Sequence, residues 1–99
     1  MATPVPDNQS IVLVDTSGGE RTIQLPEVNS CLGRLITIMD GTYTAATSNV
    51  IVQTSGSDTL LDFTATSNVF ATSGFSVTFM AGPSNNWNVV NYFGGSFPA

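Results

Sequence analysis

The sequence predicts an all-β domain of short antiparallel strands, and three observations lead to this prediction. Apolar and polar residues alternate with a period of two along most of the chain. Clusters of turn-forming residues separate these runs at roughly 8–12 residue spacing. No segment combines helical apolar spacing with capping residues. The chain has 99 residues, enough for one small domain, so we expect a small sandwich, prism or β-coil.

The first predicted strand is a continuous apolar run over residues 11–14. Such a run is typical of a strand that is covered on both faces. Residues 16–20 are rich in turn formers and end this strand. Residues 21–25 then alternate, and Pro26 ends the second strand because proline cannot donate to a β-ladder.

The third predicted strand, residues 35–39, is apolar on both faces. The two isoleucines, Ile36 and Ile38, share one face, and the other face carries Leu35 and Met39 with a threonine between them. This pattern predicts burial between layers or between subunits. Residues 49–53 form the next predicted strand.

The second half of the chain predicts four further strands. Residues 60–64 and 68–71 are short apolar runs, and residues 75–79 alternate cleanly. A turn over residues 82–86 leads into the last predicted strand, residues 87–92. Together these runs complete the all-β pattern.

Two features concern organisation. The pentapeptide at residues 46–50 recurs at residues 65–69, and a repeat of about twenty residues is one mark of stacked β-coils, although two copies also arise by coincidence. We expect one β-domain over residues 10–93. The proline-rich segment 1–9 and the tail 94–99 are expected to be extended or flexible.

The charge balance restricts the partners. The net charge is −5, with two arginines and no lysine. Because binding to nucleic acid or to an anionic membrane surface requires clusters of basic residues, we expect neither partner. The N-terminus also lacks the basic start and apolar middle of a signal peptide.

Catalytic and metal chemistry are not favoured. The chain has no histidine and a single cysteine, Cys31, so a nucleophile–base pair and a zinc site are not indicated. We interpret Cys31 as a small apolar residue. Asp58 and Asp62 fall in turns, where aspartate bonds to its own backbone, and with Asp40 they lack the spacing of an EF-hand. We therefore expect no enzyme activity, no metal and no cofactor.

A small set of side chains is suited to ligand binding. Tyr43 lies in a polar loop, where we expect it to be exposed, and Trp87 and Tyr92 belong to an aromatic cluster near the C-terminus. Aromatic faces stack on sugar rings, although packing in the core is the stronger expectation for Trp87. Arg34 is a candidate for binding an acidic sugar, with a salt bridge or a carbonyl contact as the ordinary alternative.

A family resemblance rests on four segments of this sequence. These are Gly33-Arg34-Leu35-Ile36-Thr37-Ile38-Met39-Asp40, Asn49-Val50-Ile51-Val52, Phe75-Ser76-Val77-Thr78-Phe79 and Asn86-Trp87-Asn88-Val89-Val90. The pattern resembles domains in fibre and surface proteins of large DNA viruses and in tail fibres of bacteriophages, over roughly residues 10 to 92. Two positions depart from it: Met39 stands where lysine is common, and Asp62-Phe63 where Asp-Gly is common, which leaves the shape of that turn open.

The resemblance implies a homotrimeric module at a fibre or spike tip on the virion surface. Its implied partners are two further copies of the chain, other virion proteins and a glycan or protein receptor on the host surface. A trimer would require an interface, which we expect on the apolar strands, at Leu35, Ile36, Ile38, Val50, Val52, Phe75, Val77 and Phe79. The alternative function is a monomeric carbohydrate-binding module with an aromatic platform.

Overall fold

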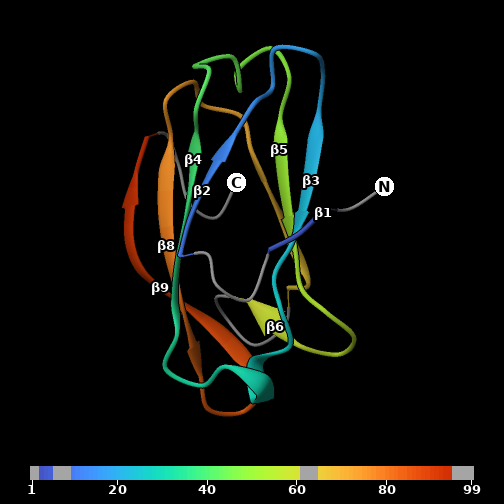
Figure 1. Ribbon diagram of the computed structural model, residues 1–99, viewed down its shortest axis with the longest axis vertical. Helices are drawn as coiled ribbons and strands as arrows, with labels where there is room; N and C mark the ends of the chain where they lie inside the picture. The colour runs from blue at the N-terminus through green and yellow to red at the C-terminus, as the bar shows by residue number, and fades with distance from the viewer. Residues whose placement is uncertain (1–2, 6–9, 61–64, 95–99) are drawn as a thin grey trace.

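A computed structural model describes residues 3–5, 10–60 and 65–94 of the protein, and within them two β-sheets pack face to face (Figure 1). The elements are β1 (Thr3–Pro4), β2 (Ile11–Val14), β3 (Arg21–Gln24), the 3₁₀ turn η1 (Val28–Ser30), β4 (Leu35–Asp40), β5 (Val50–Gln53), β6 (Thr59–Leu60), β7 (Ser67–Phe70), β8 (Ser76–Gly82) and β9 (Asn86–Phe93). The predicted all-β class is confirmed.

The strands alternate between the two sheets. Sheet A has the order β1-β3-β5-β7, and sheet B has the order β2-β4-β8-β9-β6. Each connection from β1 to β8 therefore carries the chain from one sheet to the other, and only β8 and β9 follow each other within a sheet. The first five strands wind as a β-coil inside a sandwich, so two of the expected architectures occur together.

Strand pairing is mixed rather than purely antiparallel. The coil makes β1, β3 and β5 parallel neighbours in sheet A, and β2 and β4 parallel neighbours in sheet B. Antiparallel pairs join β5 to β7, β4 to β8 and β8 to β9, while β6 is parallel to β9. Parallel neighbours arise because a chain that alternates between two sheets returns to each sheet in the same direction.

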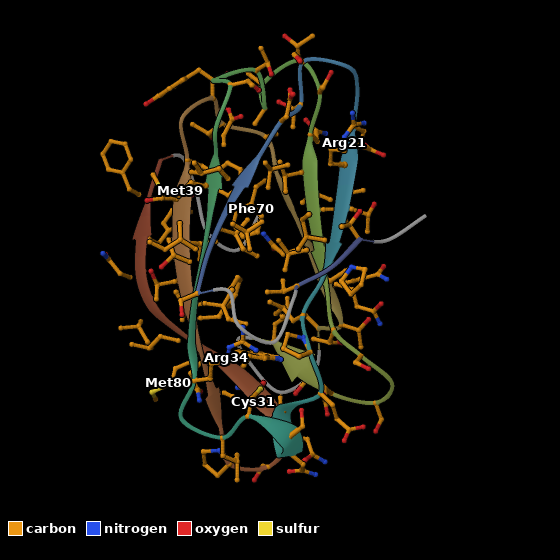
Figure 2. The ribbon with its side chains drawn as sticks, in the orientation of Figure 1. Arg21, Cys31, Arg34, Met39, Phe70 and Met80 are labelled. Atoms are coloured by element: carbon orange, nitrogen blue, oxygen red, sulfur yellow. The ribbon has the colours of Figure 1, made fainter. Side chains whose placement is uncertain are left out.

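The core lies between the sheets and is built from the inward face of each strand. Its largest fully buried side chains include Trp87, Phe75 and Phe79. The Trp87 indole N–H donates to the Pro26 carbonyl at 3.3 Å, which satisfies the one polar group of this side chain. Phe70 and Phe75 stack with ring centroids 4.7 Å apart, and Figure 2 shows Phe70 between the sheets.

The repeated pentapeptide is not a structural repeat. Its copies lead into β5 and β7, which run antiparallel beside each other. The phase of burial is also opposite, because Val50 is buried in the first copy, whereas the corresponding Val69 is exposed in the second. The repeat in the sequence therefore does not correspond to a repeat of the coil.

Three further details differ from expectation. Thr3 and Pro4 pair with β3, and the buried Val5 donates its N–H to the Gln24 carbonyl at 3.1 Å, so this part of segment 1–9 belongs to the fold. The turn η1 was not expected. Most of the strand predicted over residues 60–64 lies outside the described residues.

In the described part, no helix has the length and apolar character needed to cross a membrane.

Candidate interaction surfaces

The outer side of sheet B carries exposed apolar side chains from four neighbouring strands. Leu13 on β2 is 66% exposed and Phe93 on β9 is 70% exposed. Large apolar side chains are normally scattered singly on a surface, so a gathering of them on one sheet indicates an interaction site. We define the sheet B face as Ile11, Leu13, Leu35, Thr37, Met39, Thr78, Met80 and Phe93.

Strand register makes this face continuous, because residues that oppose each other across adjacent strands share a face. One row joins Leu13 to Met39, then to Ser76 and Phe93. The next parallel row joins Ile11 and Thr37 to Thr78 and then to Asn91. A third row joins Leu35 to Met80 and then to Asn88. Met39 and Met80 are labelled on the sheet B side of the molecule in Figure 2.

The centre of the sheet B face is polar but internally satisfied. The hydroxyls of Thr37 and Thr78 bond to each other at 2.8 Å. Because a polar group that keeps its partner loses little when water is removed, this pair tolerates burial against another surface. None of the residues that define the face is charged.

A second surface lies at the end of the sandwich where the loops after β2, β4 and β7 meet, and it is organised by Asp40. This carboxylate is 3% exposed. Its Oδ2 accepts the N–H groups of Ala45 at 2.9 Å and Gly74 at 3.0 Å. Its Oδ1 accepts the Thr16 hydroxyl at 3.4 Å. One side chain therefore ties three loops together.

Hydrogen bonding sets the ionisation of Asp40. Burial alone raises the pKa of this carboxyl, but the backbone N–H groups of Gly74, Ala45, Thr44 and Thr42 outweigh that effect, so the pKa is lower than the ordinary value of 3.8. The carboxylate therefore stays charged at neutral pH. Its negative charge holds the donors of the loops inward.

A cluster of hydroxyls extends this network. Thr42 Oγ1 accepts the Thr16 N–H at 3.1 Å. The Thr44 hydroxyl bonds to Thr42 Oγ1 at 2.9 Å and also to the Thr16 hydroxyl.

The residue before Thr16 is held by its own turn. Asp15 Oδ1 accepts the hydroxyl and the N–H of Ser17, and these two bonds lower the pKa of the Asp15 carboxyl.

Tyr43 projects from the loop between β4 and β5. Its side chain is 72% exposed, and its backbone has a positive φ of 59°. A bulky residue in this left-handed region is unusual, and the conformation costs about 1–2 kcal/mol relative to glycine. The ring lies against Gly74, where a methyl group would come within 2.9 Å of Tyr43 Cδ1. The sequence prediction of an exposed Tyr43 is confirmed.

The other three predicted ligand-binding residues are not brought together with Tyr43. Trp87 is fully buried, so it provides no platform for a ligand. Tyr92 is half-buried, and its hydroxyl donates to the Gly94 carbonyl. Arg34 is half-buried beside the start of β4, and its N–H donates to the Cys31 carbonyl at 2.9 Å.

A small pocket of about 160 Å³ lies near the end of β9. It is lined by Val69, Phe70, Ala71, Thr72, Phe75, Tyr92 and Gly94. Tyr92 contributes to this pocket, but the aromatic stack of Phe70 and Phe75 beneath it is already buried as part of the core. The lining of the pocket is mainly apolar.

The residues predicted as a subunit interface lie almost entirely inside one chain. Seven of them are buried in the core between the sheets, and these are Ile36, Ile38, Val50, Val52, Phe75, Val77 and Phe79. Only Leu35 is exposed, and it belongs to the sheet B face. The predicted interface was wrong for these seven residues because the sequence pattern shows that a strand has two apolar faces but does not show which face is covered by the same chain.

The remaining polar predictions fall into structural positions. Asp58 is buried, and its Oδ2 accepts the N–H of Val28 at 2.9 Å, so it holds the first residue of η1 rather than its own turn. Asp62 lies outside the described residues. Cys31 is half-buried, and its thiol donates to the Glu27 carbonyl. Among the described residues, no group of three or more acidic, cysteine or histidine side chains is placed to hold a metal.

Some surface residues were not predicted from the sequence. Ile11 and Leu13 were interpreted as covered, yet both side chains are exposed. The sequence carries part of the signal, because β2 and β4 are both apolar on two faces, but it does not show that they lie beside each other in sheet B.

The chain matches no protein-family model, and no curated protein sequence is similar to it.

Proposed function

We propose that this domain is a structural module of a viral particle, at the tip of a fibre, spike or tail fibre, and that it assembles as a homotrimer. The sheet B face is the single observation that carries the proposal. It presents apolar side chains from β2, β4, β8 and β9 and would be covered by the other two copies. Other virion proteins and a host-surface receptor are the further partners of such a module, which acts without catalysis.

The chemistry of the sheet B face favours a second copy as the occupant. The chain carries a net charge of −5, so two copies repel each other wherever their charged surfaces meet. The sheet B face has no charged side chain, and contact through it keeps that repulsion away from the interface. It also lacks the lysines by which sheets commonly resist association.

The width of the face fits three-fold packing. Four strands at about 4.8 Å spacing make a face about 19 Å wide. In a triangle of three such faces, each sheet would lie about 5.5 Å from the axis, close to half of the roughly 10 Å that separates packed sheets. Side chains of the central strands β4 and β8, such as Met39 and the Thr37–Thr78 pair, would then lie nearest the axis, and Leu13 on the edge strand β2 would contact a neighbouring copy.

A single substitution on the face tests the proposal. Leu13→Asp places a carboxylate on the edge strand β2, where the face would contact a neighbouring copy, and we expect it to convert the trimer to monomers while the melting curve of the separated chain stays cooperative. The matched control is Val69→Asp, which puts the same charge on an exposed valine of sheet A and should leave the trimer intact. Light scattering after size exclusion measures both. If Leu13→Asp remains trimeric, the sheet B face is not the interface.

The alternative of a monomeric carbohydrate-binding module with an aromatic platform is weakened by the position of Trp87. This side chain is fully buried, and its N–H bonds to the Pro26 carbonyl. A platform built on Trp87 would require the core to open. The aromatic side chain that remains exposed in a polar loop is Tyr43.

A further inference from the structure

The strand at one edge of sheet A is open to pairing with a further strand. In the described part of the chain, β7 has β5 on one side and no strand on the other. The Thr54 N–H donates to the Thr66 carbonyl at 3.0 Å, and alternate residues of an antiparallel strand bond to the same neighbour. The backbone groups of Ser67 and Val69 therefore point away from β5. Among the described residues neither of these two N–H groups has a partner, and the Val69 carbonyl accepts the Asn68 side-chain amide at 3.4 Å.

The edge of β7 lacks features by which other edges of this protein resist pairing. The edge strand β1 contains Pro4. β9 extends beyond its partner β6, but it carries a bulge, and the Asn91 side chain accepts the Tyr92 N–H at 2.9 Å. Bulges, prolines and charged side chains prevent a foreign strand from adding to an edge. β7 has no proline and no charged residue, and its register with β5 is regular.

The apolar pocket lies directly beside this edge. Its lining includes Val69 and Phe70 from β7 and Tyr92 from β9, so it opens between the edges of the two sheets. Phe70 stacks on Phe75, and the Tyr92 ring is tilted against Phe70 with centroids 6.4 Å apart. Figure 2 shows Phe70 between the sheets. The volume of about 160 Å³ is close to that of an apolar cavity of about 150 Å³ that binds benzene, so the pocket has room for one phenyl ring.

We propose that β7 accepts an extended segment of another protein as an added strand, and that one phenylalanine of this segment inserts into the pocket. The added strand bonds to the outward backbone groups of Ser67 and Val69, and every second side chain faces the pocket side. None of the residues that define the sheet B face lines the pocket. Under the proposed function, on which this part of the inference rests, the segment belongs to another virion protein.

The charge of the chain specifies the chemistry of the partner segment. The net charge is −5, so an acidic segment is repelled. β7 and the residues that line the pocket carry no charge, and a charged side chain would lose its hydration there without gaining a counter-charge. The three aromatic rings around the pocket favour an aromatic side chain over an aliphatic one. The occupant that this edge favours is therefore an uncharged strand with phenylalanine at its centre.

Amide NMR titration of the intact chain tests the site, with the capped peptide acetyl-Thr-Thr-Phe-Thr-Thr-amide as the probe. We expect chemical-shift changes confined to residues 67–72 and 92–94. A probe with alanine in place of phenylalanine should bind at least about tenfold more weakly, because it leaves the pocket unfilled. A probe with N-methylated backbone amides keeps the ring but loses the strand hydrogen bonds, so it should also bind more weakly.

A pair of variants tests the edge of β7 itself. Val69→Pro removes the outward N–H, and proline is tolerated on an edge strand where the N–H faces solvent. We expect the phenylalanine probe to bind this variant about tenfold more weakly. Val69→Thr keeps the N–H and should retain binding. Amide spectra establish that each variant is folded, and the N-methylated probe makes the same test on the parent chain if Val69→Pro does not fold.

Light scattering on the same samples separates this proposal from the trimer proposal, because it measures assembly independently of peptide binding. The proposal is overturned if the phenylalanine probe causes no shift in residues 67–72. It is also overturned if the N-methylated probe binds as tightly as the unmodified one, which would show a pocket for any small apolar group. A lower mass of the assembly for Val69→Pro would overturn it as well, because a second copy would then occupy this edge.

Discussion

Asp40 shows how one polar side chain organises the loop end of this protein. A buried carboxylate is unfavourable unless hydrogen bonds compensate for its lost hydration. Here the donors come from loops that are distant in sequence, including Ala45, Gly74 and Thr16. The carboxylate therefore couples the end of β4 to the loops after β2 and β7, and it fixes the position from which Tyr43 projects.

Replacing Asp40 tests this role. Asp40→Asn retains the size of the side chain but turns an acceptor toward the N–H groups into a donor, and we expect a loss of about 2–4 kcal/mol in the free energy of unfolding. Urea titration followed by circular dichroism measures the change. A loss below about 0.5 kcal/mol, within the range of ordinary surface substitutions, would contradict the network.

The same group predicts a dependence on pH. The pKa of Asp40 is lowered on folding, so its contribution to stability is complete above its ordinary pKa of 3.8 and is lost as the pH falls through the lower value of the folded state. Asp40→Asn should flatten the acid limb of the stability profile. Asp15→Asn is the control, because Asp15 also has a lowered pKa but is exposed and joins no other loop.

At the scale of single residues, sequence reasoning succeeded where the local pattern determines the environment. Tyr43 was correctly expected to be exposed because its neighbours are small and polar. Asp58 was correctly placed near a turn, but its bond to the Val28 N–H spans thirty positions in sequence. No local pattern predicts such a contact, because it depends on how the coil brings η1 to the loop before β6.

The β8–β9 hairpin illustrates what a connection requires of its residues. Gly82 pairs with Asn86, so three residues make the turn. Ser84 and Asn85 both have positive φ, at 62° and 56°. Asparagine adopts this conformation at a low cost in free energy, whereas serine adopts it at a higher cost.

This strain predicts a stabilising substitution. Ser84→Gly relieves the left-handed strain at a smaller entropic cost, and we expect the unfolding free energy to rise by about 0.5–1 kcal/mol. Thermal melting of the variant measures the gain. Ser57→Gly is the matched control: Ser57 is exposed and lacks positive φ, so glycine there should lower stability. Equal effects at both positions would rule out relief of strain at Ser84.

At the scale of elements, strand positions were predictable and strand neighbours were not. Alternation correctly placed Ile36 and Ile38 on one face of β4 and Met39 on the other. It carries no information about pairing, so the parallel contact of β2 with β4 could not be foreseen. The pentapeptide repeat was ambiguous for the same reason, because composition does not determine the direction in which a strand packs.

Ile38, predicted as a subunit contact, is a core residue, and this position determines the effect of a charge there. Ile38 is fully buried between the sheets, so Ile38→Asp places an unpaired carboxylate in the core of each chain and should cost at least 3 kcal/mol by order of magnitude. We expect unfolding of the single chain, seen as loss of the cooperative melting transition. A folded monomer with normal melting would instead return Ile38 to a subunit contact.

Considered as a whole, the molecule combines a well-filled interior with an exterior that is low in charge. Charged residues make up 9% of the chain, compared with roughly 25% in an average globular protein. The apolar sheet B face lies on this weakly charged exterior, and exposed apolar patches of this kind mark interaction sites.

The solution mass of the unmodified chain tests the central claim most directly. Light scattering after size exclusion, over a serial dilution, should give about three times the 10.4 kDa mass of one chain and should hold that value on dilution. A mass of one chain at all concentrations would contradict assembly through the sheet B face. A stable mass of two chains would contradict the three-fold arrangement.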